Sequence, residues 1–483
     1  MPALFADYWP VVVTGTAVAV SVVTSAHAVL QKRDVRAAIG WVGLIWLVPF
    51  LGAVLYAVFG VNRIQRRASE LKLQRPNLHL PGGEAWSICR DFEGALAGED
   101  RHLATIGRLV DAMATLPLTT SNAITPLGDG EAAFQEMIAV IDGAQHSVGM
   151  ATYLFDNDRA GHLFAAALER AVARGLAVRV LIDGVGARYS YPSMTAKLRR
   201  RGVPIAEFLP TFVPLYMHYA NLRNHRKILV VDGRVGFTGG MNIRGRYLVG
   251  PRNGLADQDI HFRLEGPVVA HLTDTFVEDW AFCTKETLTG GGWFPELAPA
   301  GGAIARGITA GPDEDFERIL WAILGALGQA KRRVRIVTPY FLPDQMLITA
   351  LIMAAMRGVR VDVLMPERNN LRLVQWASRP QLWQLLEHGC RVWATPPPFD
   401  HSKLMTVDGA WSLIGSTNWD PRSLRLNFEF NVEVYDRGLT AVLDRLIDAK
   451  QAASRPVTLA EIHGRSLWAK LRDGTAWLVS PYL

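Results

Sequence analysis

The chain has 483 residues, of which 49% are hydrophobic and 20% charged, and its formal net charge is +6. This length allows two or three domains with full cores, and the modest basic excess suits an anionic partner without choosing between nucleic acid and an acidic membrane. The three cysteines, Cys89, Cys283 and Cys390, form no CxxC pair, so the sequence indicates neither a disulfide framework nor a zinc site.

Two apolar runs near the N-terminus predict a pair of membrane-spanning helices. Residues 8–31 and 37–62 contain no Asp, Glu, Lys or Arg, and each run reaches the roughly 20 residues that a helix needs to cross a hydrocarbon core. A signal peptide is one alternative for the first run, because Ala26-His27-Ala28 resembles a cleavage site, but the preceding basic region is missing. Buried core helices would also be apolar, but two of them at the start of a chain are unusual. The segment after the second run holds more cations than the loop between the runs, so the positive-inside rule predicts a cytoplasmic main body.

From about residue 145 the chain repeats one succession of elements. In the first copy a predicted strand at 147–153 is followed by a helix at 161–174 and a strand at 178–182; in the second, a strand at 334–340 is followed by a helix that ends near 358 and a strand at 359–365. Strands that alternate with helices of this length indicate an α/β architecture. The Gly- and Pro-rich stretch 290–311 is the predicted linker between the two copies.

One motif occurs in both copies and reads H-x-K, four residues, D, six residues, G-[GS]-x-N. Its members are His225, Lys227, Asp232 and Asn242 in the first copy and His401, Lys403, Asp408, Ser416 and Asn418 in the second. Because side chains alternate along a strand, a His and a Lys two residues apart point to the same face.

These residue types suit phosphate chemistry. Histidine is the side chain that acts as a nucleophile or a proton carrier near neutral pH. Lysine brings a compact cation to a phosphate oxygen, asparagine adds neutral donors, and glycine lets the backbone approach a bulky ligand. The sequence offers no carboxylate cluster for a metal, so we expect neither a metal nor a cofactor.

The paired motif is that of the phospholipase D superfamily, and the chain resembles the bacterial cardiolipin synthases in particular. The closer likeness extends over nearly the whole chain and is carried by residues 48–62, 223–227, 338–341, 422–429 and 480–483. The resemblance implies two tandem phospholipase D-type α/β/α sandwich domains that are related by a pseudo-twofold axis and preceded by two transmembrane helices. The implied parts are a transmembrane hairpin (1–62), a connector (63–120), a first domain (121–295) and a second domain (305–483).

The resemblance also implies one active site where the two copies meet. His225 would attack the phosphorus and form a phosphohistidine, and His401 would protonate the departing alcohol and then deprotonate the incoming one. The phosphate oxygens would be held by Lys227, Lys403, Asn242 and Asn418. Ser416 would add a hydroxyl for which Gly240 has no equivalent, while Asp232 and Asp408 would be structural.

A downstream acid would orient each histidine: Asp259 in the first copy, with Asp257 as the rival, and Glu429 in the second. A purely structural role for these acids is the alternative. The chain departs from the expected pattern at Arg244-Gly-Arg246, where acidic residues are expected. The apolar segment 212–217 is either a lipid-entry loop or an ordinary core segment.

The function implied by this likeness is transfer of a phosphatidyl group between two phosphatidylglycerols, which gives cardiolipin and glycerol. Hydrolysis by the same chemistry, as in a phospholipase D, remains open, as do a nuclease and a non-catalytic lipid-binding protein. The partners would be phosphatidylglycerol, cardiolipin and an anionic membrane, without nucleic acid. The location would be the bacterial inner (cell) membrane, with a multi-pass chain and cytoplasmic catalytic domains.

Overall fold

A computed structural model describes residues 2–32, 35–60, 88–89, 91–210, 222–248, 256–312 and 315–480. The chain divides into two compact units, which we call the N-terminal unit (Met1–Glu70 with Phe212–Ala220) and the large unit (Leu71–Thr211 with Asn221–Leu483). The segment 212–217 and residues 63–87 and 90 of the predicted connector lie outside the described residues.

The N-terminal unit differs from the predicted pair of spanning helices. Its elements are α1 (Pro2–Gln31), α2 (Val35–Leu47), α3 (Pro49–Leu55) and η1 (Tyr56–Gly60). Among the described residues, Tyr8–Gln31 is the one helix that is long and apolar enough to cross a membrane. The second apolar run is not a continuous helix, because Pro49 lacks an N–H and disfavours helical backbone at Val48, whose φ and ψ are −139° and 78°.

The interrupted second run packs back on α1. Helices α2 and α3 both contact α1, and Ala28, Ile45 and Tyr56 form a small buried cluster between them. The hydroxyl of Tyr56 lies 2.8 Å from Nδ1 of His27, and its ring meets the ring of Trp41 edge to face. The 13-residue helix α2 spans about 20 Å, which is less than the roughly 30 Å of a hydrocarbon core.

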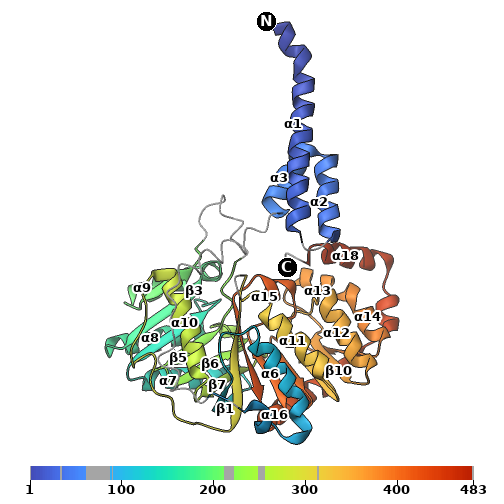
Figure 1. Ribbon diagram of the computed structural model, residues 1–483. Coiled ribbons are helices and arrows are strands. Elements are labelled where there is room, and N and C mark those ends of the chain that lie inside the picture. Colours follow the sequence, from blue (N-terminus) through green and yellow to red (C-terminus); the bar gives the residue numbers. More distant parts are fainter. Residues whose placement is uncertain are drawn as a thin grey trace. The chain divides into compact units, whose positions relative to one another are not determined.

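The large unit is built on one mixed sheet of 15 strands, in the order β15-β11-β10-β9-β12-β13-β14-β8-β1-β7-β6-β5-β2-β3-β4. Figure 1 shows strands of this unit with helices packed around them. The strands up to the middle of the chain are β1 (Thr119–Leu127), β2 (Ser147–Thr152), β3 (Ala177–Asp183), β4 (Ile205–Phe208), β5 (Ile228–Val231), β6 (Val235–Gly239) and β7 (His261–Glu265). The later strands are β8 (Ala303–Ala310), β9 (Arg333–Val337), β10 (Arg360–Pro366), β11 (Arg391–Thr395), β12 (Leu404–Val407), β13 (Trp411–Gly415), β14 (Glu429–Tyr435) and β15 (Arg455–Val457). The two sets run outward from the central antiparallel pair β1–β8 in the same succession, to which the second set adds β15.

Helices cover both sets of strands. The longer ones are α6 (Ala104–Asp111), α7 (Gly130–Gly143), α8 (Arg159–Ala173), α10 (Val269–Thr284), α11 (Arg318–Gln329), α12 (Gln345–Met356), α16 (Arg437–Ala452) and α18 (Leu467–Leu478). The shorter ones are α5 (Phe92–Ala95), η2 (Gly98–Leu103), η3 (Gly186–Arg188), α9 (Met194–Arg200), η5 (Gly245–Tyr247), α13 (Arg372–Ser378), η6 (Arg379–Gln381), α14 (Leu382–Glu387), α15 (Pro421–Arg425) and α17 (Leu459–His463).

The predicted repeat of strand, helix and strand is confirmed in both places. It corresponds to β2, α8 and β3 in the first set and to β9, α12 and β10 in the second, and the two strands are parallel in each case. Each helix begins after an aspartate that caps it: Asp158 accepts the N–H of Gly161 at 3.1 Å, and Asp344 accepts the N–H of Leu347 at 3.0 Å.

The predicted linker 290–311 is wrong in its second part. Residues Ala303–Ala310 form β8, every residue of which is buried. The small residues and glycine of this segment resemble a linker in sequence, but β8 pairs with β14 on one side and β1 on the other. A boundary at residue 305 therefore falls inside a central strand.

Candidate active site

The two H-x-K segments enter the centre of the sheet at equivalent strands. His225 and Lys227 come directly before β5, and His401 and Lys403 come directly before β12. Each segment pairs with backbone from the other half of the sheet. The N–H of His225 donates to the carbonyl of Phe428 at 2.9 Å, and the N–H of His401 donates to the carbonyl of Gln258 at 2.7 Å.

This backbone pairing decides which acid meets which histidine. Nδ1 of His225 lies 2.9 Å from Glu429, and Nδ1 of His401 lies 2.8 Å from Asp259. The prediction that each acid serves the histidine of its own copy is therefore wrong, and the partners are exchanged. The physical reason is that Phe428 and Gln258, which hold the histidine backbones, directly precede Glu429 and Asp259.

The lysines lie beside the histidines, as their spacing predicts. Nζ of Lys227 donates to the carbonyl of His225 at 2.7 Å, and Nζ of Lys403 donates to the carbonyl of His401 at 2.6 Å. Nζ of Lys403 also lies 3.0 Å from Nδ1 of His401. All four side chains are nearly or fully buried, so each charge acts on its neighbours with little screening by water.

Burial sets the protonation of the site. It lowers the pKa of His225 to about 4, against the opposing effect of Glu429, and lowers that of His401 well below its usual value, with help from the neighbouring lysines. Burial likewise lowers the pKa of Lys227 to about 7 and that of Lys403 to about 8. Each lysine further lowers the pKa of the other motif's histidine, so the two motifs share one electrostatic site. Such a cluster of desolvated cations favours an anionic ligand.

The carboxyl group of Asp259 responds to the same environment. Burial raises its pKa to about 7, although Lys403 and the N–H of Ile260 favour the ionised form. The rival residue, Asp257, forms an ion pair with Arg246 instead. Arg244, the other departure from the expected pattern, donates from Nε to Asp156 at 2.5 Å.

The asparagines of the two G-[GS]-x-N segments make different hydrogen bonds. The side-chain oxygen of Asn242 accepts the N–H of Leu154 at 3.2 Å, whereas Nδ2 of Asn418 donates to Ser423 at 3.2 Å. The side-chain oxygen of Asn418 is buried and has no hydrogen-bond partner among the residues that the structure describes. The amide groups therefore have different neighbours, and only Asn418 combines a buried side chain with an unused acceptor.

The hydroxyl of Ser416 is bound to a carboxylate of the site. It donates to Glu429 and accepts the N–H of Phe430 at 3.1 Å. At the matching position in the first copy, a Cβ on Gly240 would lie 2.4 Å from a carboxylate oxygen of Asp259. The predicted asymmetry is thus visible in the structure: Asp259 occupies the space that a side chain at Gly240 would need.

The two motif aspartates, Asp232 and Asp408, accept hydrogen bonds from backbone N–H groups. The carboxylate of Asp232 accepts the N–H groups of three consecutive residues, Gln145, His146 and Ser147, at 2.7–2.9 Å. Asp408 does the same for Lys331, Arg332 and Arg333 at 2.8–2.9 Å, and also bonds Nε2 of His102 at 2.8 Å. Each aspartate anchors the start of the neighbouring strand, β2 or β9.

Three tyrosines border the histidines and were not predicted as site residues. The ring of Tyr153 meets the ring of His225 edge to face, with centroids 5.3 Å apart. The ring of Tyr340 meets His401 in the same way at 6.0 Å, and the hydroxyl of Tyr247 lies 3.3 Å from Nδ1 of His401. The available signal was position, because Tyr153 and Tyr340 closely follow β2 and β9 in the repeat. In the described part of the chain, no group of three or more His, Cys, Asp or Glu residues is arranged to hold a metal ion.

Comparison with known proteins gives consistent results. Residues 137–280 and 323–450 match the family described as "Cardiolipin synthase, PLD-like domain", and residues 18–60 match "Phospholipase_D-nuclease N-terminal". A cardiolipin synthase A of Pseudomonas putida (strain GB-1) is 32% identical, with 96% of each chain covered. A cardiolipin synthase of Geobacillus sp. (strain WCH70) is 31% identical over 99% of this chain and 96% of its own.

Among solved structures, a phosphatidylserine synthase of Haemophilus influenzae has a similar fold. Its TM-score is 0.61 at 17% sequence identity, and the match covers 78% of this chain and 100% of that one.

Proposed function

The chain belongs to the cardiolipin synthase family of phospholipase D-like enzymes, and we propose that it transfers a phosphatidyl group from one phosphatidylglycerol to another. The products are cardiolipin and glycerol. One observation carries the proposal: each motif histidine pairs with an acid from the opposite half, so the two motifs form one site.

In the first step, Nε2 of His225 attacks the phosphorus of the donor lipid. A proton on Nδ1 donates to Glu429, which leaves the lone pair of Nε2 available. The new P–N bond forms as the bond to the glycerol oxygen breaks, and His401 gives that oxygen a proton. Without substrate the site holds the pKa of His401 well below its usual value. The negative charge of the bound phosphodiester raises that pKa and so favours the protonated imidazole.

The phosphate oxygens are held by Lys227 and Lys403, with the amides of Asn242 and Asn418 as further donors. Both lysines lie at the strand ends beside the histidines, where fixed donors stabilise the charge that develops in the transition state. The carboxylates of Glu429 and Asp259 act by positioning the two imidazoles, while Asp232 and Asp408 act on the backbone.

In the second step, His401 takes the proton of the incoming hydroxyl, whose oxygen attacks the phosphorus and breaks the P–N bond. A second phosphatidylglycerol supplies that hydroxyl. One phosphodiester is made for each one broken, so the transfer needs no nucleotide, and added glycerol reverses it. Synthesis rather than hydrolysis requires that water is largely excluded from the intermediate.

The matched strand orders support two tandem domains related by a pseudo-twofold axis, as predicted for 121–295 and 305–483, except that the second domain includes the whole of β8 and so starts no later than residue 303. The equivalent contacts of Asp232 and Asp408 support the same relation. The N-terminal unit, with α1 as its long apolar helix, supports attachment to the bacterial inner (cell) membrane. The larger number of cations after residue 60 supports a cytoplasmic large unit.

The test is a product assay on purified full-length protein with labelled phosphatidylglycerol and a chelator. We expect cardiolipin and glycerol as the main products, with a rate that the chelator does not change. Mostly phosphatidic acid would make the protein a hydrolase, and loss of activity to the chelator would contradict the histidine mechanism. His225→Ala is the control for a contaminating enzyme.

A further inference from the structure

The helix α18, near the C-terminus, has apolar side chains on the side that faces away from the large unit. It begins after Ser466, whose hydroxyl accepts the N–H of Ala469 at 3.3 Å. Leu467 and Leu478 are each 70% exposed and Leu471 is 53% exposed, while Trp468 is 81% exposed. On an ordinary surface helix the outward side is polar, so this exposure requires an explanation.

The exposed leucines form one stripe. Leu467, Leu471 and Leu478 fall on the same side of the helix by their spacing, opposite to Asp473 and Ala476, which are buried. We call this stripe, together with Trp468 and Trp477 at its edges, the α18 face. The inward side of α18 packs against α13 and η6, which leaves the α18 face exposed.

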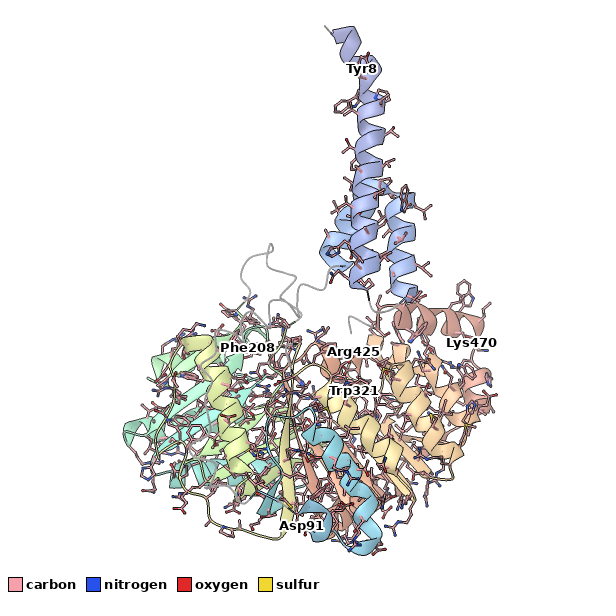
Figure 2. All side chains as sticks on the ribbon, in the orientation of Figure 1. Tyr8, Asp91, Phe208, Trp321, Arg425 and Lys470 are labelled. Atoms are coloured by element: carbon pink, nitrogen blue, oxygen red, sulfur yellow. The ribbon has the colours of Figure 1, made fainter. Side chains whose placement is uncertain are left out.

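The charges around the α18 face are basic. Lys470 is exposed (Figure 2), and the guanidinium of Arg472 lies 4.6 Å from the ring centroid of Trp376. The acid of the helix, Asp473, is buried and paired with Arg465 and Arg472. In α13 and its flanks, residues 368–379 contain three arginines and no acid, and Leu371 and Leu373 are exposed there.

We propose that the α18 face is an interfacial helix surface that docks the large unit onto an anionic lipid surface. An apolar stripe edged by tryptophans and basic residues is the pattern of a helix that lies in the plane of a membrane interface. The tryptophan rings match the headgroup level, and Lys470, Arg472 and the arginines of α13 match the charge of anionic lipids. A partner protein with an acidic surface would satisfy the charges but not the stripe of leucines.

Docking at this place would bring lipid near the active site. Ala476 of α18 packs in one cluster with Leu342, Val374 and Ala377, and Tyr340 packs against the same cluster. The ring of Tyr340 borders His401 at 6.0 Å. The α18 face therefore lies one layer of side chains from the loop that borders the proposed general acid, and a lipid surface held there shortens the path of a substrate to the histidines.

The experiment places a fluorescent label on the α18 face of the full-length chain. Leu471→Cys carries an NBD group in a chain in which Cys89 and Cys283 are replaced by serine, while Cys390 is buried. The matched control is Leu163→Cys on α8, which is 45% exposed. Both proteins are placed in nanodiscs of phosphatidylglycerol or of phosphatidylcholine, with and without lipids that carry a nitroxide quencher on the acyl chain.

In phosphatidylglycerol we expect the emission of the label at residue 471 to shift to shorter wavelength and to be mostly quenched by the nitroxide lipid. The emission of the label at residue 163 should show neither the shift nor the quenching. Adding Lys470→Gln should lower the ratio of docked to undocked protein about fivefold in phosphatidylglycerol and leave it unchanged in phosphatidylcholine.

Three results would overturn the proposal. A label at 471 that stays aqueous in phosphatidylglycerol would show that no lipid contacts the helix. A shifted emission without quenching by lipid would show that protein, either a second copy or another part of this chain, covers the α18 face. Equal quenching in both lipids would remove the anionic preference. None of these readouts uses turnover, so they do not depend on the proposed reaction.

Discussion

At the scale of single residues, the exchange of acids between the two histidines separates two chemical steps. Glu429 contacts the histidine that we propose as nucleophile, and Asp259 contacts the one that we propose as general acid and base. A substitution of either acid should therefore affect one step more than the other, although both acids lie in the same site.

A substrate with an activated leaving group separates those steps, because its departure needs no proton. With a nitrophenyl phosphodiester, Glu429→Gln should slow the burst that reports the adduct on His225, whereas Asp259→Asn should leave the burst and slow the following transfer to an alcohol. Each effect should be about 10²-fold or more, the usual weight of acid–base assistance. The reverse pattern in rapid-mixing experiments would mean that His401 is the nucleophile.

The pKa values of the two lysines predict how the activity of the free enzyme depends on pH. Both must be cationic to hold the phosphate, and burial lowers their pKa values to about 7 for Lys227 and about 8 for Lys403. As basic groups they lose charge when the pH rises through those values, so kcat/KM should fall between about pH 7 and 9. On the acid side, His225 stays neutral down to its pKa of about 4.

The measurement is kcat/KM against pH in nanodiscs of fixed composition. Lys227→Arg is the informative variant, because Lys227 has the lower of the two pKa values and a guanidinium stays charged. The onset of the alkaline fall should therefore move from about pH 7 towards the pKa of Lys403 at about 8, whatever the effect on the rate. A profile that remains flat up to pH 9 in the wild type would contradict the assignment of the fall to these lysines.

At the scale of elements, the turns that follow β5 and β12 hold the sheet together. Asp232 and Asp408 both have φ of 53°, and the glycine after each also has positive φ. Aspartate tolerates this backbone conformation better than most residues. The carboxylate of each aspartate also accepts three consecutive N–H groups at the start of the neighbouring strand in the sheet, β2 for Asp232 and β9 for Asp408.

Asp408→Ala should lower the free energy of unfolding by about 2 kcal/mol, because it leaves three part-buried N–H groups without an acceptor and places alanine at positive φ. Asp408→Asn should cost less, since it keeps one acceptor oxygen and the conformational tolerance. Denaturant unfolding of the full-length protein in detergent measures both. If the alanine variant were as stable as wild type but inactive, Asp408 would have a chemical role that the structure does not indicate.

At the scale of the whole molecule, the large unit holds all the proposed catalytic groups and the N-terminal unit holds none. Removal of residues 1–60 should leave a folded protein that still hydrolyses or transfers a soluble activated phosphodiester. Its rate on phosphatidylglycerol in bilayers should fall, because attachment raises the effective concentration of enzyme at the lipid surface.

Circular dichroism and the two substrate assays, run side by side, check this prediction. The contrast between the substrates is the control, since a general defect would lower both rates. Loss of the folded state on truncation would show that the large unit depends on the N-terminal helices for its stability.

The sequence by itself determined the chemistry and the local elements. The paired H-x-K motifs and the strand–helix–strand repeat depend on neighbouring residues, so their pattern can be read along the chain. The long apolar helix α1 is equally local. Family resemblance extended this reading to the proposed roles of His225 and His401.

Only the tertiary structure decided which groups meet. Glu429 and Asp259 exchange partners because strand pairing between segments far apart in the chain joins Phe428 to His225 and Gln258 to His401. The same non-local pairing makes residues 303–310 a central strand although their composition resembles a linker. The second apolar run has the composition of a spanning helix, yet the helix is interrupted at Val48 and Pro49 and the two shorter helices pack on α1. Composition measures how apolar a segment is, whereas its path depends on backbone geometry and on the surfaces that it contacts.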